Sequence, residues 1–251
     1  MTVLARDLAL ALDAVAFARA AGLEPDPWQA RILRSAARRT MLNCSRQAGK
    51  STVTSLLALH TALYVPGSLI LILAPALRQS QELFRKVKQH ASACNIPNEA
   101  IEAETSLRIE LANGARIETL PGKEGTIRGF SAVSLLIVDE ASRVPDELYR
   151  AVRPMLAVSG GRLALLSSPF GKRGFFYEEW HGGGPLWERI EVPATQIPRI
   201  SADFLAEERR ALGPWYNQEY MCQFLDTQFQ LYSTSDIDAA IRTDVAPLFG
   251  V

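Results

Sequence analysis

Cysteine is scarce in this sequence. The three cysteines, Cys44, Cys94 and Cys222, are scattered along a chain of 251 residues. An odd number of cysteines without close spacing excludes a disulfide framework and the paired spacing of a zinc site. This pattern is typical of a protein that works in a reducing cytoplasm.

An excess of charge of one sign is also missing, as is a long uncharged apolar run near the N-terminus. Lys and Arg total 27, and Asp and Glu total 27, so the formal net charge is zero. A nucleic-acid surface would therefore have to be a local patch. Residues 3–21 are rich in apolar residues but include Arg6, Asp7, Asp13 and Arg19. We interpret this segment as one amphipathic helix, and not as a signal peptide or a membrane span.

What the sequence does have is the composition of a globular protein, with 48% hydrophobic and 22% charged residues and no internal repeat. The length suits one large α/β domain with a small appendage. The composition shifts at about Ser201 into two expected helices that are separated at Gly213 and Pro214. We therefore expect a core over residues 1–195 and a helical lid or linker over residues 196–251.

The stretch that organises the chain is MLNCSRQAGKST, residues 41–52. A short apolar strand, small residues, Gly-Lys-Ser and an apolar helix together predict a phosphate-binding loop. Its backbone N–H groups and the positive end of the helix dipole would bind phosphate oxygens. Lys50 would reach the β- and γ-phosphates of ATP, and the Ser51 hydroxyl would hold Mg²⁺. The residues expected to bind the nucleotide are Ser45, Arg46, Gln47, Ala48, Gly49, Lys50, Ser51 and Thr52.

The loop departs from the usual pattern at Cys44, where a glycine is expected six residues before the lysine. Cysteine lacks the freedom of glycine at positive φ. Either the loop starts along a different path, or Cys44 has ordinary backbone angles. A chance Gly-Lys-Ser at the start of a helix is the competing interpretation of the whole stretch.

Two carboxylates follow a second buried strand. Residues 133–142, VSLLIVDEAS, predict a strand that ends in Asp139 and Glu140 at the edge where open parallel sheets bind ligands. Adjacent buried acids are costly unless they serve a metal or a reaction. Asp139 would hold Mg²⁺, and Glu140 would orient and deprotonate the attacking water. The alternative is a pair that only caps the next helix, in which Pro145 suits an early position.

Two polar residues outside these stretches are further candidates. Gln29 lies just upstream of the loop strand, and its side-chain amide offers both a donor and an acceptor to adenine. The alternative is a surface glutamine on an amphipathic helix. Ser167 follows a third buried strand, where it would lie beside the γ-phosphate, unless Ser167-Ser168-Pro169 is only a turn.

The remaining pattern predicts alternating strands and helices. We expect helices over residues 28–39, 77–93, 145–158 and 174–181, buried strands over 68–74 and 162–166, a hairpin over 106–120 and an edge strand over 186–192. The charged face of residues 77–93 is interpreted as solvated, with DNA contact as the less favoured alternative. Residues 121–131, PGKEGTIRGFS, predict an exposed, mobile loop carrying Arg128.

Four segments in order, CSRQAGKS, TIRGF, LLIVDEAS and LSSPFGKRGFFYEEW, resemble the ATPase domain of the large terminase subunit of tailed bacteriophages. The segment ERR…WYNQEYMCQFLD is similar to the helical part that joins this ATPase to a nuclease domain. The resemblance implies a mostly parallel sheet flanked by helices, as in phosphate-loop NTPases of the additional-strand, catalytic-glutamate type. It implies adenine recognition by Gln29, a γ-phosphate contact by Arg46, coupling of hydrolysis to movement through Ser167-Ser168-Pro169, and an arginine finger at Arg128 that enters a neighbouring subunit.

The family pumps DNA into viral capsids, so the resemblance implies an ATP- and Mg²⁺-dependent motor acting on double-stranded DNA. The implied partners are further copies in a ring on the capsid portal and the small terminase subunit. The implied location is the cytoplasm of the infected host, with transient docking on the procapsid and no membrane. The family carries its nuclease acids on later strands, so we expect no nuclease activity from these residues. The apolar run at 245–251 suggests the start of a further domain.

Two other functions compete with a ring motor. A helicase-like enzyme would unwind duplexes with two motor domains, but this chain has one phosphate-binding loop. A nucleotide-dependent assembly switch would hydrolyse ATP slowly, and Glu140 argues against it. An arginine on the surface without a catalytic role remains the alternative for Arg128.

Overall fold

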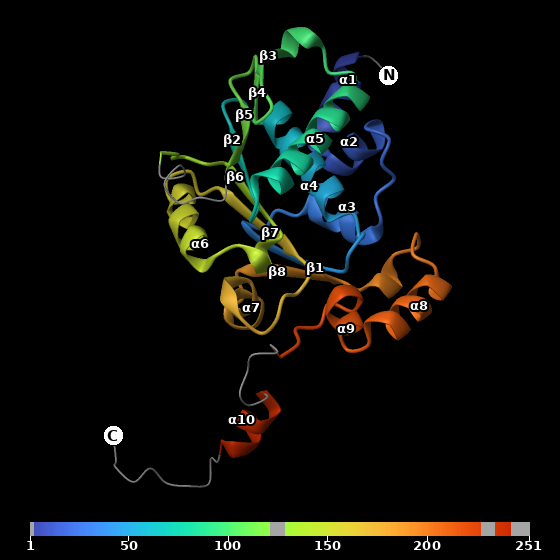
Figure 1. Cartoon of the computed structure of the whole chain (residues 1–251). Helices are drawn as coiled ribbons and strands as arrows, with labels where there is room; N and C mark the ends of the chain where they lie inside the picture. Colours follow the sequence, from blue (N-terminus) through green and yellow to red (C-terminus); the bar gives the residue numbers. More distant parts are fainter. Residues whose placement is uncertain (1–2, 121–128, 227–233, 242–251) are drawn as a thin grey trace.

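A central sheet of mainly parallel strands organises the chain, whose computed structural model describes residues 3–120, 129–226 and 234–241 (Figure 1). Among the described residues the sheet has eight strands in the order β3-β4-β5-β2-β6-β7-β1-β8. They are β1 (Arg39–Cys44), β2 (Leu69–Leu73), β3 (Ile101–Glu104), β4 (Arg108–Leu111), β5 (Arg116–Leu120), β6 (Leu135–Asp139), β7 (Arg162–Ser167) and β8 (Trp187–Val192). Pairings β3·β4 and β4·β5 are antiparallel, and the other pairings are parallel.

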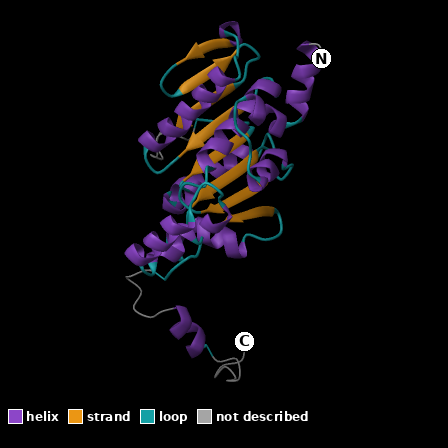
Figure 2. Cartoon of the chain, turned by 90° about the vertical axis from the view of Figure 1, so that its right-hand side faces the viewer, coloured by secondary structure: helices purple, strands orange, loops and turns teal. Residues whose placement is uncertain are grey.

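The position of β7 is diagnostic of the fold class. It is inserted between β1, which leads into the phosphate-binding loop, and β6, which ends in the acidic pair. The predicted additional strand between these two elements is therefore confirmed. Figure 2 shows the strands as one twisted layer with helices around it.

Helices cover both faces of the sheet (Figure 1). On one face lie α1 (Val3–Leu12), α2 (Ala14–Ala20), α3 (Pro27–Arg34), α4 (Lys50–Tyr64) and α5 (Leu77–Ala93), and on the other lie α6 (Asp146–Val152) and α7 (Gly174–Gly182). Helices α8 (Ala202–Leu212) and α9 (Trp215–Tyr220) follow β8, and α10 (Thr234–Ala240) comes last. No described helix is long and apolar enough to span a membrane.

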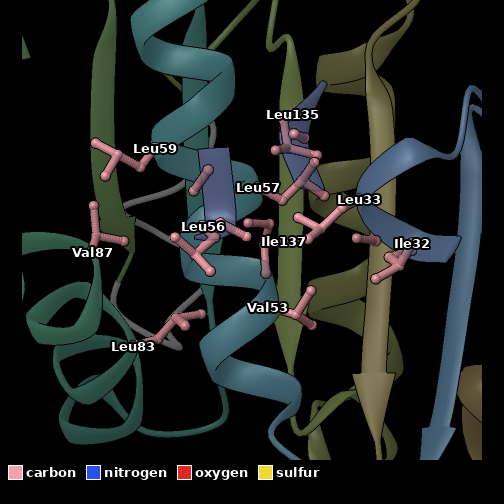
Figure 3. Close-up of a cluster of buried hydrophobic side chains, with 14 of the residues drawn as sticks. Ile32, Leu33, Val53, Leu56, Leu57, Leu59, Leu83, Val87, Leu135 and Ile137 are labelled. Carbon is pink, nitrogen blue, oxygen red and sulfur yellow. The ribbon is translucent and has the colours of Figure 1, made fainter. Parts of the chain in front are cut away.

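The buried strands alternate their side chains between two hydrophobic clusters. Ile137 of β6 packs on the side of α3, α4 and α5, whereas Val138 packs with the cluster on the side of α6 and α7. Figure 3 shows Leu56 and Leu57 of α4 packed against this first side of the sheet. Burying one such side chain contributes about 1.5–3 kcal/mol. The near-continuous apolar sequence of β2 and β6 follows from burial on both faces.

Two expected helices are shorter than the sequence suggested. The helix predicted over residues 3–21 is two helices, because Asp13 breaks it and its Oδ1 accepts the Val15 N–H at 3.0 Å as the cap of α2. The helix predicted over 28–39 ends at Arg34. Ser35 has extended backbone angles, and its hydroxyl accepts the Ala37 N–H at 3.1 Å, which directs the chain into β1.

The expected helix over 145–158 is also interrupted. It is regular only to Val152, and residues Arg153–Leu156 form a tighter 3₁₀ turn that contains Pro154. Proline has no N–H to donate and its ring crowds the preceding turn, so the α-helix ends there. Strand β3, which pairs at the outer edge, was not predicted.

Most other expectations are confirmed. The hairpin β4–β5, helices α5 and α7, the edge strand β8 and the pair α8–α9 occur where the pattern placed them. The Ser201 hydroxyl caps α8 by accepting the Phe204 N–H at 3.2 Å. Residues 121–128, most of the expected exposed loop, and residues 242–251 lie outside the described residues.

Candidate active site

A pocket of about 660 Å³ opens at the carboxyl ends of β1 and β6. Its walls come from the phosphate-binding loop, helix α5, the segment after β6 and the residue after β7. The lining residues are Arg46, Gln47, Ala48, Gly49, Lys50, Ser51, Thr52, Gln79, Lys86, Glu140, Arg143 and Ser168. The structure thus brings the loop and one member of the acidic pair together, as the sequence predicted.

The backbone of the loop depends on Gly49, which precedes α4 in the left-handed conformation at φ 92°. A Cβ atom here would lie 2.9 Å from the side-chain nitrogen of Gln29. Gln47 also has a positive φ, at 58°. Left-handed angles and close packing explain why a small residue is needed before Lys50.

The loop presents N–H groups to the pocket. The N–H groups of Ser45 and Arg46 are already bonded, to the carbonyls of Val192 at 3.0 Å and Glu219 at 3.1 Å. Among the described residues, the N–H groups of residues 47–49 have no acceptor. Unpaired N–H groups beside the start of a helix form an anion-binding concavity.

Lys50 is nearly buried within this loop. Its ammonium group donates to the carbonyls of Cys44 at 3.2 Å and Ser45 at 2.9 Å. Within the described part of the chain it has no ion-pair partner at bonding distance. A buried cation held only by carbonyl groups is electrostatically prepared for an anionic ligand.

Cys44 and Ser45 lie behind the pocket surface. Cys44 ends β1 and is absent from the described residues with positive φ, so the alternative with ordinary backbone angles is the correct one. Burial raises the pKa of its thiol to about 12, and the thiol is therefore not a nucleophile. Ser45 is fully buried and is not a lining residue.

Asp139 is buried next to Ser51, which lines the pocket. The Ser51 hydroxyl donates to Asp139 Oδ2 at 3.3 Å, and the N–H of Glu140 donates to Oδ1 at 3.0 Å. Burial, followed by repulsion from Glu140, raises the pKa of Asp139 to about 6, although Lys50 opposes this. Mg²⁺ prefers oxygen ligands from carboxylates and hydroxyls and keeps several waters. The donors of Ser51 and Asp139 fit such an ion.

Glu140 lines the pocket in a strained conformation. Its backbone is left-handed, at φ 50° and ψ 40°, which is unfavourable for a residue with a Cβ. Such strain is concentrated at functional positions. Its carboxylate lies 3.9 Å from Arg143, and its side chain caps no helix in the described structure. The alternative in which the acidic pair only caps the next helix is therefore wrong.

Ser167 connects β7 to the segment after Glu140. It is fully buried, and its hydroxyl contacts the Ser142 hydroxyl at 2.7 Å and accepts the Ser142 N–H at 3.2 Å. The Ser142 hydroxyl also donates to the carbonyl of Ser168 at 2.8 Å. Ser168, and not Ser167, lines the pocket. The expected direct contact of Ser167 with a nucleotide stays a prediction, whereas its link to the Glu140 segment is observed.

Gln29 is buried, at 2% exposure, so its interpretation as a surface residue is wrong. Its side-chain oxygen accepts the Asp26 N–H at 2.9 Å, and its nitrogen lies against Gly49. Adenine recognition by Gln29 stays a prediction. Arg128 lies outside the described residues, and its part as an arginine finger likewise stays a prediction.

Sequence reasoning missed four residues at or beside the pocket. Gln79 and Lys86 of α5 and Arg143 line it, and Lys86 donates to the Thr52 hydroxyl at 3.4 Å. Glu219 of α9 is ion-paired with Arg46. The interpretation of residues 77–93 as a merely solvated face is wrong at Lys86. No local motif marks these residues, because tertiary packing brings them to the loop.

The model of one protein family matches residues 41–239. It describes the N-terminal part of terminase large subunits of the T4likevirus type. The chain belongs to the terminase large-subunit family. The terminase large subunit of Thermus virus P23-45 is 29% identical to this chain over 256 residues, a match covering 86% of this chain and 52% of that protein. The chain spans about half the length of the curated terminases it matches.

Solved terminase structures have the same fold. The large terminase ATPase domain of Thermus phage P74-26 superimposes with a TM-score of 0.73 at 24% identity, covering 83% of this chain and 97% of that chain. The large terminase of a thermophilic bacteriophage, solved in complex with ADP, gives a TM-score of 0.66 at 12% identity, covering 79% and 53%. The expected phosphate-loop fold of a terminase ATPase domain is therefore confirmed.

Proposed function

We propose that this terminase chain hydrolyses ATP with Mg²⁺ and uses the energy to move double-stranded DNA into a procapsid. The observation that carries the proposal is a pocket lined by Lys50, Ser51 and Glu140, in which the Ser51 hydroxyl donates to the buried carboxylate of Asp139. A P-loop lysine, a hydroxyl, a buried aspartate and a pocket-lining glutamate are the parts that phosphoryl transfer to water needs. The complex of the thermophilic phage terminase with ADP, in a protein of similar fold, supports nucleotide binding.

Each residue has a defined part in this proposal. The N–H groups of residues 47–49 and the ammonium of Lys50 bind the phosphates, while Gln29 orients the adenine. Ser51 and Asp139 hold Mg²⁺, which neutralises charge on the phosphates when bound. Glu140 accepts the proton of the attacking water. Arg46 contacts the γ-phosphate, and Ser167 transmits the change after hydrolysis to the segment that carries Glu140.

The proposed assembly is a homo-oligomeric ring on the capsid portal that works with the small terminase subunit. It acts in the cytoplasm of the infected host. Arg128 would supply its guanidinium to the neighbouring subunit, where such a group is worth about 10³–10⁵ in rate. We expect no nuclease activity from the residues present. DNA-stimulated turnover separates this motor from an assembly switch, and ring formation separates it from a helicase-like monomer.

The first test is nucleotide binding. Lys50→Ala removes the cation that faces the phosphates, so we expect a nucleotide titration with Mg²⁺ to show no binding by this variant. Arg6→Ala, on exposed α1, is the control and should bind as the wild type does. Equal binding by Lys50→Ala and the wild type would contradict the assignment of the loop.

The second test separates binding from chemistry. Glu140→Gln keeps the side-chain shape but cannot accept a proton. We expect nearly unchanged ATP affinity and a turnover lower by about 10²–10⁴. Phosphate release under single-turnover conditions measures this. Wild-type turnover in the variant would assign the general base to another residue.

A further inference from the structure

Arginines gather at the amino ends of β1, β7 and β8, the edge of the sheet opposite to the pocket. Arg31 and Arg34 lie in the last turn of α3, which leads into β1, and Arg38 directly precedes that strand. Arg162 begins β7. We call these four residues the amino-edge arginines. In a chain with no net charge, they form the kind of local basic patch that a nucleic-acid surface requires.

Hydrogen bonds hold the amino-edge arginines close together. One carboxylate oxygen of Glu188, near the start of β8, accepts from Arg31 Nε at 2.8 Å, and the other is bonded to the Ser35 hydroxyl. The Ser35 carbonyl accepts from Arg162 Nη2 at 3.1 Å. The parallel pairing of β1 with β7 places Arg38 beside Arg162. The arginines of three separate segments thus share one surface.

The acids at this edge do not neutralise the positive charge. Arg34 is ion-paired with Asp13 at 2.7 Å, and Glu188 is already bonded as described. Within the described part of the chain, Arg38 and Arg162 have no acid at bonding distance. The Nε atom of Arg162 is buried and has no hydrogen-bond partner there. A partly buried cation without an acid is costly, and binding of an anion at this edge would offset that cost.

We propose that the amino-edge arginines bind the phosphate backbone of double-stranded DNA. The inference rests on the proposed function and names a surface through which this chain holds its DNA. Guanidinium groups bind phosphate oxygens through parallel N–H groups. Contacts to phosphates carry no sequence information, which suits a motor that must move along any sequence. An acidic protein surface offers similar charge, but DNA is the polyanion on which the proposed motor acts.

This surface lies at the far ends of the strands that lead into the catalytic segments. Strand β1 follows Arg38 and ends at the phosphate-binding loop. Strand β7 begins at Arg162 and ends at Ser167, which is bonded to the segment after Glu140. A strand of six residues spans about 20 Å. Substitutions at the amino edge therefore leave the pocket intact, and DNA binding can be measured separately from ATP binding.

Binding of a fluorescein-labelled duplex at several salt concentrations, followed by anisotropy, tests the surface. Arg38 is exposed, and its side chain bonds no described residue, so Arg38→Ala removes a charge without breaking a bond. We expect about three- to tenfold weaker binding, and a slope of log affinity against log salt that is smaller by about one. Adding Arg34→Ala should lower the slope by about two in all. Arg38→Lys should restore most of the affinity. Arg210→Ala, at an exposed position on α8, is the matched control and should bind as the wild type does.

Three further readouts separate this surface from its alternatives. Two duplexes of unrelated sequence should lose affinity equally in Arg38→Ala. ATP affinity and basal turnover of this variant should equal those of the wild type. A labelled polyglutamate peptide, the probe for an acidic protein surface, should bind the wild type more weakly than the duplex does.

The proposal would be overturned by an unchanged salt slope in both alanine variants, by tighter binding of polyglutamate than of DNA, or by a wild type that binds no duplex at low salt. A wild type that neither binds nor hydrolyses ATP would instead contradict the proposed function.

Discussion

The buried carboxyl group of Asp139 lowers the stability of the folded chain at neutral pH, because burial disfavours its charged form. Its pKa is raised from 3.8 to about 6, so between these values the folded chain retains a proton that the unfolded chain has released. Stability therefore falls as the pH rises through this window. A shift of this size corresponds to about 3 kcal/mol at neutral pH and above.

We predict that Asp139→Asn stabilises the nucleotide-free chain at pH 8 and abolishes ATP turnover. The amide keeps the shape and carries no buried charge. Urea unfolding at pH 8 should show a gain of up to about 3 kcal/mol, which shrinks as the pH approaches 4. Asp203→Asn, at an exposed position on α8, should show no comparable pH-dependent gain. A variant that is no more stable than the wild type at pH 8 would contradict this account.

At the residue scale, the local sequence predicts site residues where one short segment contributes several of them. Gly49, Lys50 and Ser51 are adjacent, and so are Asp139 and Glu140, so their patterns predicted both halves of the pocket. Lys86 and Glu219 lack such a pattern. Each comes from a helix remote in sequence from the loop it contacts, and only tertiary packing makes them neighbours.

At the element scale, His60 connects the N-terminal helices to the helix that follows the loop. Its ring nitrogen Nε2 donates to the Leu10 carbonyl at 3.0 Å, and its ring lies 5.4 Å from that of Phe17 and 5.0 Å from that of Tyr64. Burial lowers the pKa of His60 below 6.5 despite this hydrogen bond. The unfolded chain therefore takes up a proton first as the pH falls, and stability is lost below pH 6.5.

We predict that His60→Phe reduces the loss of stability between pH 7 and pH 5. Phenylalanine keeps an aromatic ring against Phe17 and Tyr64 but cannot be protonated. The slope of unfolding free energy against pH, from urea titrations, should be smaller than in the wild type. His181→Gln removes an exposed imidazole from α7 and should leave the slope as it is. An unchanged slope in His60→Phe would show that burial of His60 carries no pH dependence.

Element boundaries were predictable where periodicity and capping residues agree. Ser201 and the Gly213–Pro214 pair placed α8 and α9 correctly. Asp13 was interpreted as one charged residue on a helix face, yet its carboxylate caps α2 and pairs with Arg34 at 2.7 Å. A capping aspartate and a helical surface aspartate look alike in sequence, because the difference lies in the ψ angle and in a distant partner.

At the scale of the whole molecule, the parallel orientation of most strands was predictable. The full set of residues that make a complete catalytic centre was not. Buried apolar runs alternating with helices predict a parallel sheet, and β7 lies where the fold class requires it. The pocket contains Arg46, Arg143 and Lys86 from this chain. A further arginine can come from a second chain only if the chains assemble. No local pattern within a single sequence encodes that assembly.

We predict that Arg128 acts in trans, and the decisive measurement is a mixture of two inactive variants. Arg128→Ala provides a pocket without the arginine, and Lys50→Ala provides the arginine without a working pocket. Each variant alone should be inactive. The mixture should recover partial ATPase activity under conditions that support assembly, because at some interfaces the intact pocket of one subunit then meets the Arg128 of its neighbour. Specific activity of the wild type should likewise rise with protein concentration. No recovery in a mixture whose assembly is confirmed by sedimentation would assign Arg128 to its own subunit or to the surface.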